Sequence, residues 1–158
     1  MLNSIFNPVT LKSAAMALGK WWNSVTEEPS PPFRITDVQI ASTNKDGSII
    51  IEYGYEIKAS MTQFLKPKLT IESDVEGAFD ILVNVFDAKS VKHVINNSYV
   101  SVAGYSYKNN VSLKKGHNVC ELTGIGGSDI GNWKPGEHRF VFFNEREQCL
   151  YTKKFIIY

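Results

Sequence analysis

Hydrophobic and polar residues alternate with a period of two along most of this chain. The longest such run covers residues 49–58, where apolar and mostly polar positions alternate, the apolar ones being Ile49, Ile51, Tyr53, Tyr55 and Ile57. Successive side chains of a strand point to opposite faces, so we predict a long strand with one buried face. Residues 35–42 predict a strand before it, and Asp46-Gly47 between the two is a strong hairpin-turn signal.

Seven further short segments predict strands, at residues 68–72, 79–86, 91–95, 110–113, 118–122, 138–143 and 150–157. Residues 79–86 are apolar on both faces apart from Asp80 and Asn84, which predicts a central strand. Residues 144–147 are expected to turn the last hairpin. Many short strands separated by turns are typical of an all-β sandwich.

The first 32 residues have a different pattern. Asn7 can cap a helix, and Pro8 suits the first helical position. Apolar residues then recur at helical spacing, namely Leu11, Ala14, Ala15, Leu18, Trp22 and Val25. Three prolines in residues 26–32 predict a stiff, extended linker. We therefore predict an amphipathic helix and a proline-rich linker at residues 1–32, followed by a β-sandwich at residues 33–158.

The last quarter of the chain resembles a known class of domain. It reads Trp133-Lys-Pro-Gly136-Glu-His138-Arg-Phe140, then a strand, a polar turn, Cys149-Leu150 and Lys154-Phe155-Ile156-Ile157. This order resembles the last hairpin of bacterial immunoglobulin-like sandwich domains. The resemblance implies an immunoglobulin-like antiparallel sandwich, and by itself no activity, because sandwiches host many functions. The Cys-Trp-Cys framework of antibody domains is not matched, because Cys120, Trp133 and Cys149 lie too close together.

Composition narrows the range of functions. The 158 residues suit one globular domain, and 17 basic against 16 acidic residues show no basic footprint for nucleic acid. No apolar stretch approaches the roughly 20 residues of a membrane span. No basic residue precedes Lys12, so we read no secretory signal and expect a cytoplasmic protein. Cys120 and Cys149 are then expected to be buried thiols, and a disulfide between them stays open if the protein is exported by another route.

Several motifs suggest chemistry, and for each we favour a structural explanation. The glycine-rich stretch at residues 124–131 lacks the Gly-Lys-Ser/Thr ending of a phosphate loop, so turns explain its glycines. The histidines His93, His117 and His138 lack metal-ligand spacing. Cys120 stands three residues from His117, and such residues point to opposite faces of a strand. We therefore predict a buried cysteine here and no catalytic thiol.

The acidic residues Glu72, Asp74, Glu76 and Asp80 surround a turn at Gly77. Clustered carboxylates are calcium ligands, but these do not match the EF-hand pattern. We favour a solvated acidic loop. We accordingly predict no catalytic residue, no metal and no cofactor.

Two segments are candidate binding surfaces. Tyr105 and Tyr107 belong to an aromatic loop, and exposed tyrosines supply rigid contact area. Because they are two residues apart, both can instead pack inward on one strand face, which we favour. The apolar stripe of the N-terminal helix must be buried against its own sandwich, a partner or a membrane surface.

These observations predict a non-enzymatic binding or assembly module whose helix docks a partner protein or another copy. The expected partner-binding residues are Leu11, Leu18, Trp21, Trp22, Val25, Tyr105 and Tyr107. One alternative is an accessory protein anchored to a membrane surface by the helix, although only two lysines lie on its polar face. Another is a carbohydrate-active or hydrolytic domain that uses carboxylates on the sandwich face.

Overall fold

The computed structural model describes residues 29–87, 92–93 and 104–158. The predicted N-terminal helix lies outside the described residues. The described strands all belong to one unit, Pro32–Tyr158. This unit is all-β, as the period-two pattern predicts.

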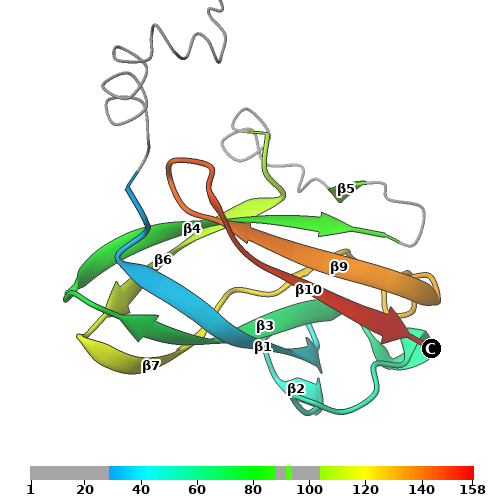
Figure 1. Cartoon of the computed structure of the whole chain (residues 1–158). Coiled ribbons are helices and arrows are strands. Elements are labelled where there is room, and N and C mark those ends of the chain that lie inside the picture. The colour runs from blue at the N-terminus through cyan, green and yellow to red at the C-terminus, as the bar shows by residue number, and fades with distance from the viewer. Residues whose placement is uncertain (1–28, 88–91, 94–103) are drawn as a thin grey trace, which may run out of the picture. The chain divides into compact units, whose positions relative to one another are not determined.

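Two antiparallel sheets make up this unit (Figure 1). The strands of the first sheet are β1 (Phe33–Thr43), β2 (Ile49–Ile51), β3 (Phe64–Ser73), β7 (Gly116–Glu121) and β8 (Ile125–Gly126). Its order is β2-β1-β3-β7, and β8 also pairs with β3. The strands of the second sheet are β4 (Gly77–Phe86), β5 (Lys92–His93), β6 (Tyr107–Leu113), β9 (Gly136–Phe143) and β10 (Cys149–Ile157). Its order is β10-β9-β4-β5, and β6 also pairs with β4. A short 3-10 helix, η1 (Ala59–Met61), precedes β3.

The hydrophobic core takes side chains from both sheets. Along β3, buried and half-buried residues alternate without a break, as expected for a strand with one face toward the core. Among the described residues, the apolar side chains with no exposed surface are Val38, Ala41, Leu65, Leu69, Ile71, Ile81, Val83, Val85, Phe140 and Phe142. They come from β1, β3, β4 and β9, so both sheets depend on the same core.

The prediction that residues 79–86 form a central strand is confirmed. β4 pairs with β9 on one side and with β5 and β6 on the other. Its two polar residues are both hydrogen-bonded across the sheet. The Asp80 carboxylate accepts a bond from the Asn110 amide at 3.0 Å, and Asn84 Oδ1 accepts one from the Ser106 backbone N–H at 3.2 Å.

Both predicted hairpin turns are present and are built alike. Asn44 Oδ1 accepts the backbone N–H groups of Asp46 and Ser48, at 3.1 and 3.0 Å. Asn144 closes the turn between β9 and β10 in the same way, at 3.0 Å to Arg146 N and 2.9 Å to Gln148 N. An asparagine side chain that replaces backbone partners in this way stabilises a tight turn.

The prediction of a long strand over residues 49–58 is wrong. β2 ends at Ile51, and Gly54 has a φ of 86°, which belongs to a turn and not to a strand. The Tyr55 backbone N–H donates to Glu52 O at 3.3 Å and closes that turn. Ile57 is buried in the core again and forms a parallel bridge with Ile157. The alternating pattern therefore covers a loop in which only Ile51 and Ile57, at its two ends, are buried.

The strand predicted at residues 68–72 is longer in the structure, because β3 begins at Phe64 and includes Pro67. Pro67 O accepts the Leu122 N–H at 2.9 Å, so this edge of Pro67 faces the segment between β7 and β8. Within a strand, the N and O of one residue point to the same side. Pro67 and Leu122 therefore share a single backbone hydrogen bond, and the missing proline N–H falls just past the end of β7, where the ladder stops.

Candidate functional site

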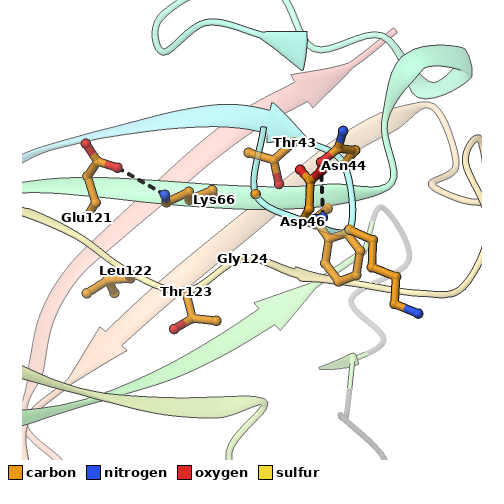
Figure 2. A pocket seen from close by; sticks show the side chains of 11 residues that line it. Thr43, Asn44, Asp46, Lys66, Glu121, Leu122, Thr123 and Gly124 are labelled. Carbon is orange, nitrogen blue, oxygen red and sulfur yellow. Dashed lines mark hydrogen bonds and ion pairs between the residues drawn. The ribbon is translucent and has the colours of Figure 1, made fainter. Parts of the chain in front are cut away.

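An open pocket of about 400 Å³ lies where the β1–β2 turn approaches the segment between β7 and β8 (Figure 2). We call it the Lys66–Glu121 pocket. It is lined by Thr43, Asn44, Lys45, Asp46, Gly47, Phe64, Lys66, Glu121, Leu122, Thr123 and Gly124. Phe64 and Lys66 are alternate residues on the outward face of β3 and form its floor.

Both walls of this pocket are held by hydrogen bonds. One wall is the turn at Asn44, closed by Gly47 N–H donating to Asn44 O at 3.1 Å. The other wall includes Thr123, whose N–H donates to Asn109 Oδ1 at 2.7 Å and whose hydroxyl accepts from Asn109 Nδ2 at 3.0 Å. These bonds fix the backbone of each wall before any ligand binds, which lowers the entropic cost of binding.

A chain of polar contacts runs from Lys66 and Glu121, which line the pocket, to Tyr53 and Lys68, which do not. Lys66 Nζ lies 3.0 Å from Glu121 Oε1, and the Tyr53 hydroxyl donates to the same oxygen at 3.2 Å. Lys68 Nζ lies 4.4 Å from the centre of the Tyr53 ring, within cation–π range. The four side chains come from β3, β7 and the loop after β2, so the network joins two strands of the first sheet to that loop.

This network alters the acidity of its members. The hydrogen bond from Lys66 lowers the pKa of the Glu121 carboxyl, and burial raises the pKa of the Tyr53 hydroxyl, with the Glu121 charge adding to the effect. Hydrogen bonds from Ser48 lower the pKa of Asp46 in the same pocket. Both carboxylates therefore stay ionised at neutral pH and act as hydrogen-bond acceptors. A general acid requires the opposite, a raised carboxyl pKa.

The lowered pKa of Glu121 predicts a pH-dependent contribution to stability. Its pKa in the folded state lies below the ordinary value of 4.5, so the stabilisation is full above pH 4.5 and is lost as the pH falls through the lowered value. Because Glu121 is half exposed, the Glu121→Gln change should cost less than about 1 kcal/mol. Urea unfolding at neutral and acidic pH should show this difference shrinking as the pH falls. Glu56→Gln, at an exposed carboxylate, is the control. A difference in unfolding free energy between native and Glu121→Gln chains that stays constant with pH would contradict the prediction.

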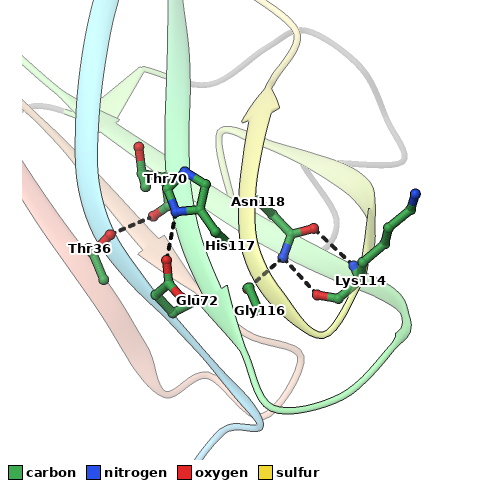
Figure 3. Close-up of polar contacts among 7 residues, drawn as sticks. All are labelled: Thr36, Thr70, Glu72, Lys114, Gly116, His117 and Asn118. Atoms are coloured by element: carbon green, nitrogen blue, oxygen red, sulfur yellow. Dashed lines mark hydrogen bonds and ion pairs between the residues drawn. The ribbon is translucent and has the colours of Figure 1, made fainter.

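A second polar cluster joins β3 to β7 at the other end of the first sheet (Figure 3). His117 Nδ1 lies 2.7 Å from Glu72 Oε2, and Asn118 Nδ2 donates to Lys114 O at 2.8 Å. On the neighbouring strand, Thr36 Oγ1 donates to Thr70 O at 3.3 Å. These bonds connect adjacent strands and the β6–β7 turn, so they stabilise the edge of the sheet.

The acidic cluster predicted from the sequence is divided among separate partners. Glu72 contacts His117, Asp74 lies 3.9 Å from Arg34, and Asp80 lies 3.8 Å from Lys108. Within residues 29–87, 92–93 and 104–158, no group of three or more His, Cys, Asp or Glu side chains is placed to hold a metal ion. Across the same residues, no helix is long and apolar enough to span a membrane.

The glycine-rich stretch includes a strand that the sequence reasoning missed, β8. Gly126 lies against the start of β3, where an added Cβ would overlap Gln63 O. Gly131 has a φ of 88°, and its N–H donates to Thr62 O at 2.9 Å. Close backbone packing and a left-handed turn thus account for these two glycines.

The two cysteines are not paired. Cys120 is half-buried on β7, and Cys149 is exposed at the start of β10, so the expectation of two buried thiols is wrong for Cys149. Burial raises the pKa of the Cys120 thiol. On β7, His117 is exposed and Cys120 is half-buried, as expected for opposite faces of the strand.

The two tyrosines proposed for partner binding have different environments. Tyr107 is 4% exposed and packs in the core from β6, so it is not available on the surface, and inward packing describes it correctly. Burial also raises the pKa of its hydroxyl. Tyr105 is half-buried, with its ring centre 5.8 Å from that of Phe143. The other predicted partner-binding residues, Leu11, Leu18, Trp21, Trp22 and Val25, lie outside the described residues.

An exposed apolar cluster lies close to the Lys66–Glu121 pocket. It consists of Ile50, Met61 and Ile130, which are 45%, 44% and 62% exposed, and we call it the Ile130 cluster. These side chains line an adjoining pocket of about 330 Å³ together with Thr43, Asn44, Ser60 and Gln63. None of the residues that line this second pocket is charged.

No family model matches the chain, and no curated protein matches it. Among solved structures, the C-terminal domain of Wzt matches at 12% identity and a TM-score of 0.43, over 82% of this chain and 69% of that chain. An immunoglobulin-like protein from Pseudomonas aeruginosa matches at 13% identity and a TM-score of 0.41, over 83% of this chain and 100% of that chain. A β-glucosidase from Listeria innocua matches at 16% identity and a TM-score of 0.41, over 80% of this chain and 16% of that chain. This is the loose immunoglobulin-like resemblance that the last hairpin predicts, and matches this distant carry no information on activity or ligand.

Proposed function

We propose that this protein is a non-enzymatic binding or assembly module and that its Ile130 cluster docks another copy of the chain. The observation that carries the proposal is the exposure of three large apolar side chains around one pocket. Grouped apolar side chains on a surface mark interaction sites more often than scattered ones do. Because no charged residue lines this pocket, two copies can meet there without like-charge repulsion.

The acidity of the pocket carboxylates supports binding over catalysis. The carboxylates of the Lys66–Glu121 pocket, Asp46 and Glu121, share one lining, which is the arrangement that a hydrolytic domain would need. However, hydrogen bonds lower the pKa of both groups, whereas glycoside hydrolysis needs one protonated acid. The hydrolytic alternative is therefore the less favoured one.

The N-terminal segment adds a second docking element to the proposal. We expect its helix to bind a partner protein or another copy through Leu11, Leu18, Trp21, Trp22 and Val25, in a cytoplasmic setting. Deletion of residues 1–28 should then reduce partner recovery or the mass of the assembly. The membrane-surface alternative predicts co-sedimentation with liposomes, weakened by replacing Trp21 and Trp22 with alanine.

Self-association through the Ile130 cluster can be tested by introducing one charged side chain into it. Ile130→Lys places an ammonium group in the apolar contact, where its desolvation opposes docking. Light scattering over a range of concentrations should show a dimer for the native chain and a monomer for the variant. Val119→Lys, at an exposed apolar residue on β7, should leave the dimer intact. A monomeric native chain at every concentration, or an unchanged Ile130→Lys dimer, would show that this surface does not join two copies.

A further inference from the structure

The Lys66–Glu121 pocket has a balanced set of charges. Lys45 and Lys66 supply two positive groups, and Asp46 and Glu121 supply two negative groups. An acidic ligand would meet both carboxylates, and a basic ligand would meet both ammonium groups. In either case repulsion from the like charges would offset much of the attraction to the opposite charges. The lining thus favours a ligand without net charge that has many hydrogen-bonding groups of its own.

The pocket also offers one apolar surface. Phe64 is half-buried on the floor, beside Lys66 on the same face of β3. Gly124 lines the pocket next to it, and an added Cβ there would lie 3.4 Å from Phe64 Cβ. The absence of a side chain at Gly124 therefore leaves the phenylalanine open to the pocket. A ligand that fits must have an apolar face as well as polar edges.

Donors and acceptors surround that apolar floor. The Lys66 ammonium has three N–H groups, and its ion pair with Glu121 uses one of them. The Glu121 and Asp46 carboxylates have further lone pairs beyond the bonds from Tyr53 and Ser48. As Figure 2 shows, Glu121 and Lys66 lie on one side of the pocket and Asp46 on the other, so a bound molecule would lie between them.

We propose that the Lys66–Glu121 pocket binds a neutral sugar unit of an oligosaccharide. A pyranose ring has an apolar C–H face that can cover Phe64 and hydroxyl groups at its edges that can bond Lys66, Glu121 and Asp46. A volume of about 400 Å³ lies in the usual range for small-molecule sites. The proposal goes beyond the binding of another copy, which uses the Ile130 cluster, and involves no bond cleavage.

The full chain is to be tested first on an array of neutral and acidic glycans. The best neutral oligosaccharide is then titrated calorimetrically into the native protein and two variants, Glu121→Gln and Lys66→Met. Each variant should bind at least tenfold more weakly, because each removes one side of the charge pair that contacts the hydroxyl groups. Glu56→Gln, at an exposed carboxylate outside the pocket, should bind like the native protein.

The outcomes separate this proposal from the previous one. Binding of neutral glycans that Glu121→Gln and Lys66→Met both weaken, with unfolding temperatures close to the native value, supports the sugar site. An array that captures no glycan, captures acidic glycans alone, or shows equal affinity for native and variant chains overturns it. Ile130→Lys tests self-association alone and is expected to leave glycan affinity within twofold of the native value. If the native chain is monomeric and binds the sugar, the proposal of self-association is wrong and the proposal of a sugar site is supported.

Discussion

Removal of residues 155–158 is expected to unfold the β-sandwich. Ile157 is 1% exposed, and the Phe155 ring packs against His138 and Phe140 with ring centres 5.9 and 5.6 Å apart. The last residues also tie the sheet to the loop before η1, because Tyr158 N–H donates to Ile57 O and Tyr158 O accepts from Ala59 N–H, both at 2.8 Å. Each lost apolar side chain costs about 1.5–3 kcal/mol, and each unpaired buried backbone group adds about 1–3 kcal/mol, against a typical total of about 5–15 kcal/mol.

Thermal unfolding followed by circular dichroism measures this effect. The chain without residues 155–158 should show no cooperative transition at physiological temperature or above. The matched control is the chain without residues 1–28, which keeps all the described strands and should unfold cooperatively. A cooperative transition in the C-terminal deletion, or none in the N-terminal deletion, would mean that the core is completed by a different segment.

The sequence predicted the class of the fold because burial of one strand face leaves a period-two signal. The signal was correct where one face of a strand is buried, as at residues 138–143 of β9, which alternate between buried and half-buried. It was wrong for residues 49–58, where a turn at Gly54 happens to preserve the alternation. A glycine within an alternating run weakens a strand and often marks a bend, so Gly54 was the local sign against one long strand.

The candidate site was beyond what the sequence alone could predict. Lys66 and Glu121 are far apart along the chain and are brought together because β3 pairs with β7, in a register that sets Lys68 opposite Glu121. Strand order and register depend on tertiary packing, and no local residue pattern records them. Neither Lys66 nor Glu121 belongs to a recognisable motif, so the only signal would have been the β3–β7 pairing itself.

The same limit explains the glycine-rich stretch, whose turn-forming role was predicted and whose packing role was not. Trp133 Nε1 donates to Gln63 O at 3.0 Å, and Gln63 Nε2 donates to Gly127 O at 3.0 Å. Gln63 is therefore bonded on its backbone and its side chain to the segment that contains β8. Because Gly126 packs directly on the Gln63 carbonyl, this contact has no room for a side chain.

Gly126→Ala is accordingly expected to be among the most destabilising single changes in the sandwich. The new methyl group would overlap Gln63 O and lie 2.8 Å from Phe64 Cδ1, and the Gln63 carbonyl is held by the buried Trp133 bond. Relief requires a backbone shift between β8 and β3, at a cost of about 3 kcal/mol or more. Gly127→Ala is the matched control, because an added Cβ there meets nothing within 4 Å, and it should change stability by less than about 1 kcal/mol. Urea unfolding of both variants compares them directly. Equal midpoints for Gly126→Ala and the native chain would show that β8 can move away from β3 without loss, which would also make the wall of the Lys66–Glu121 pocket adjustable.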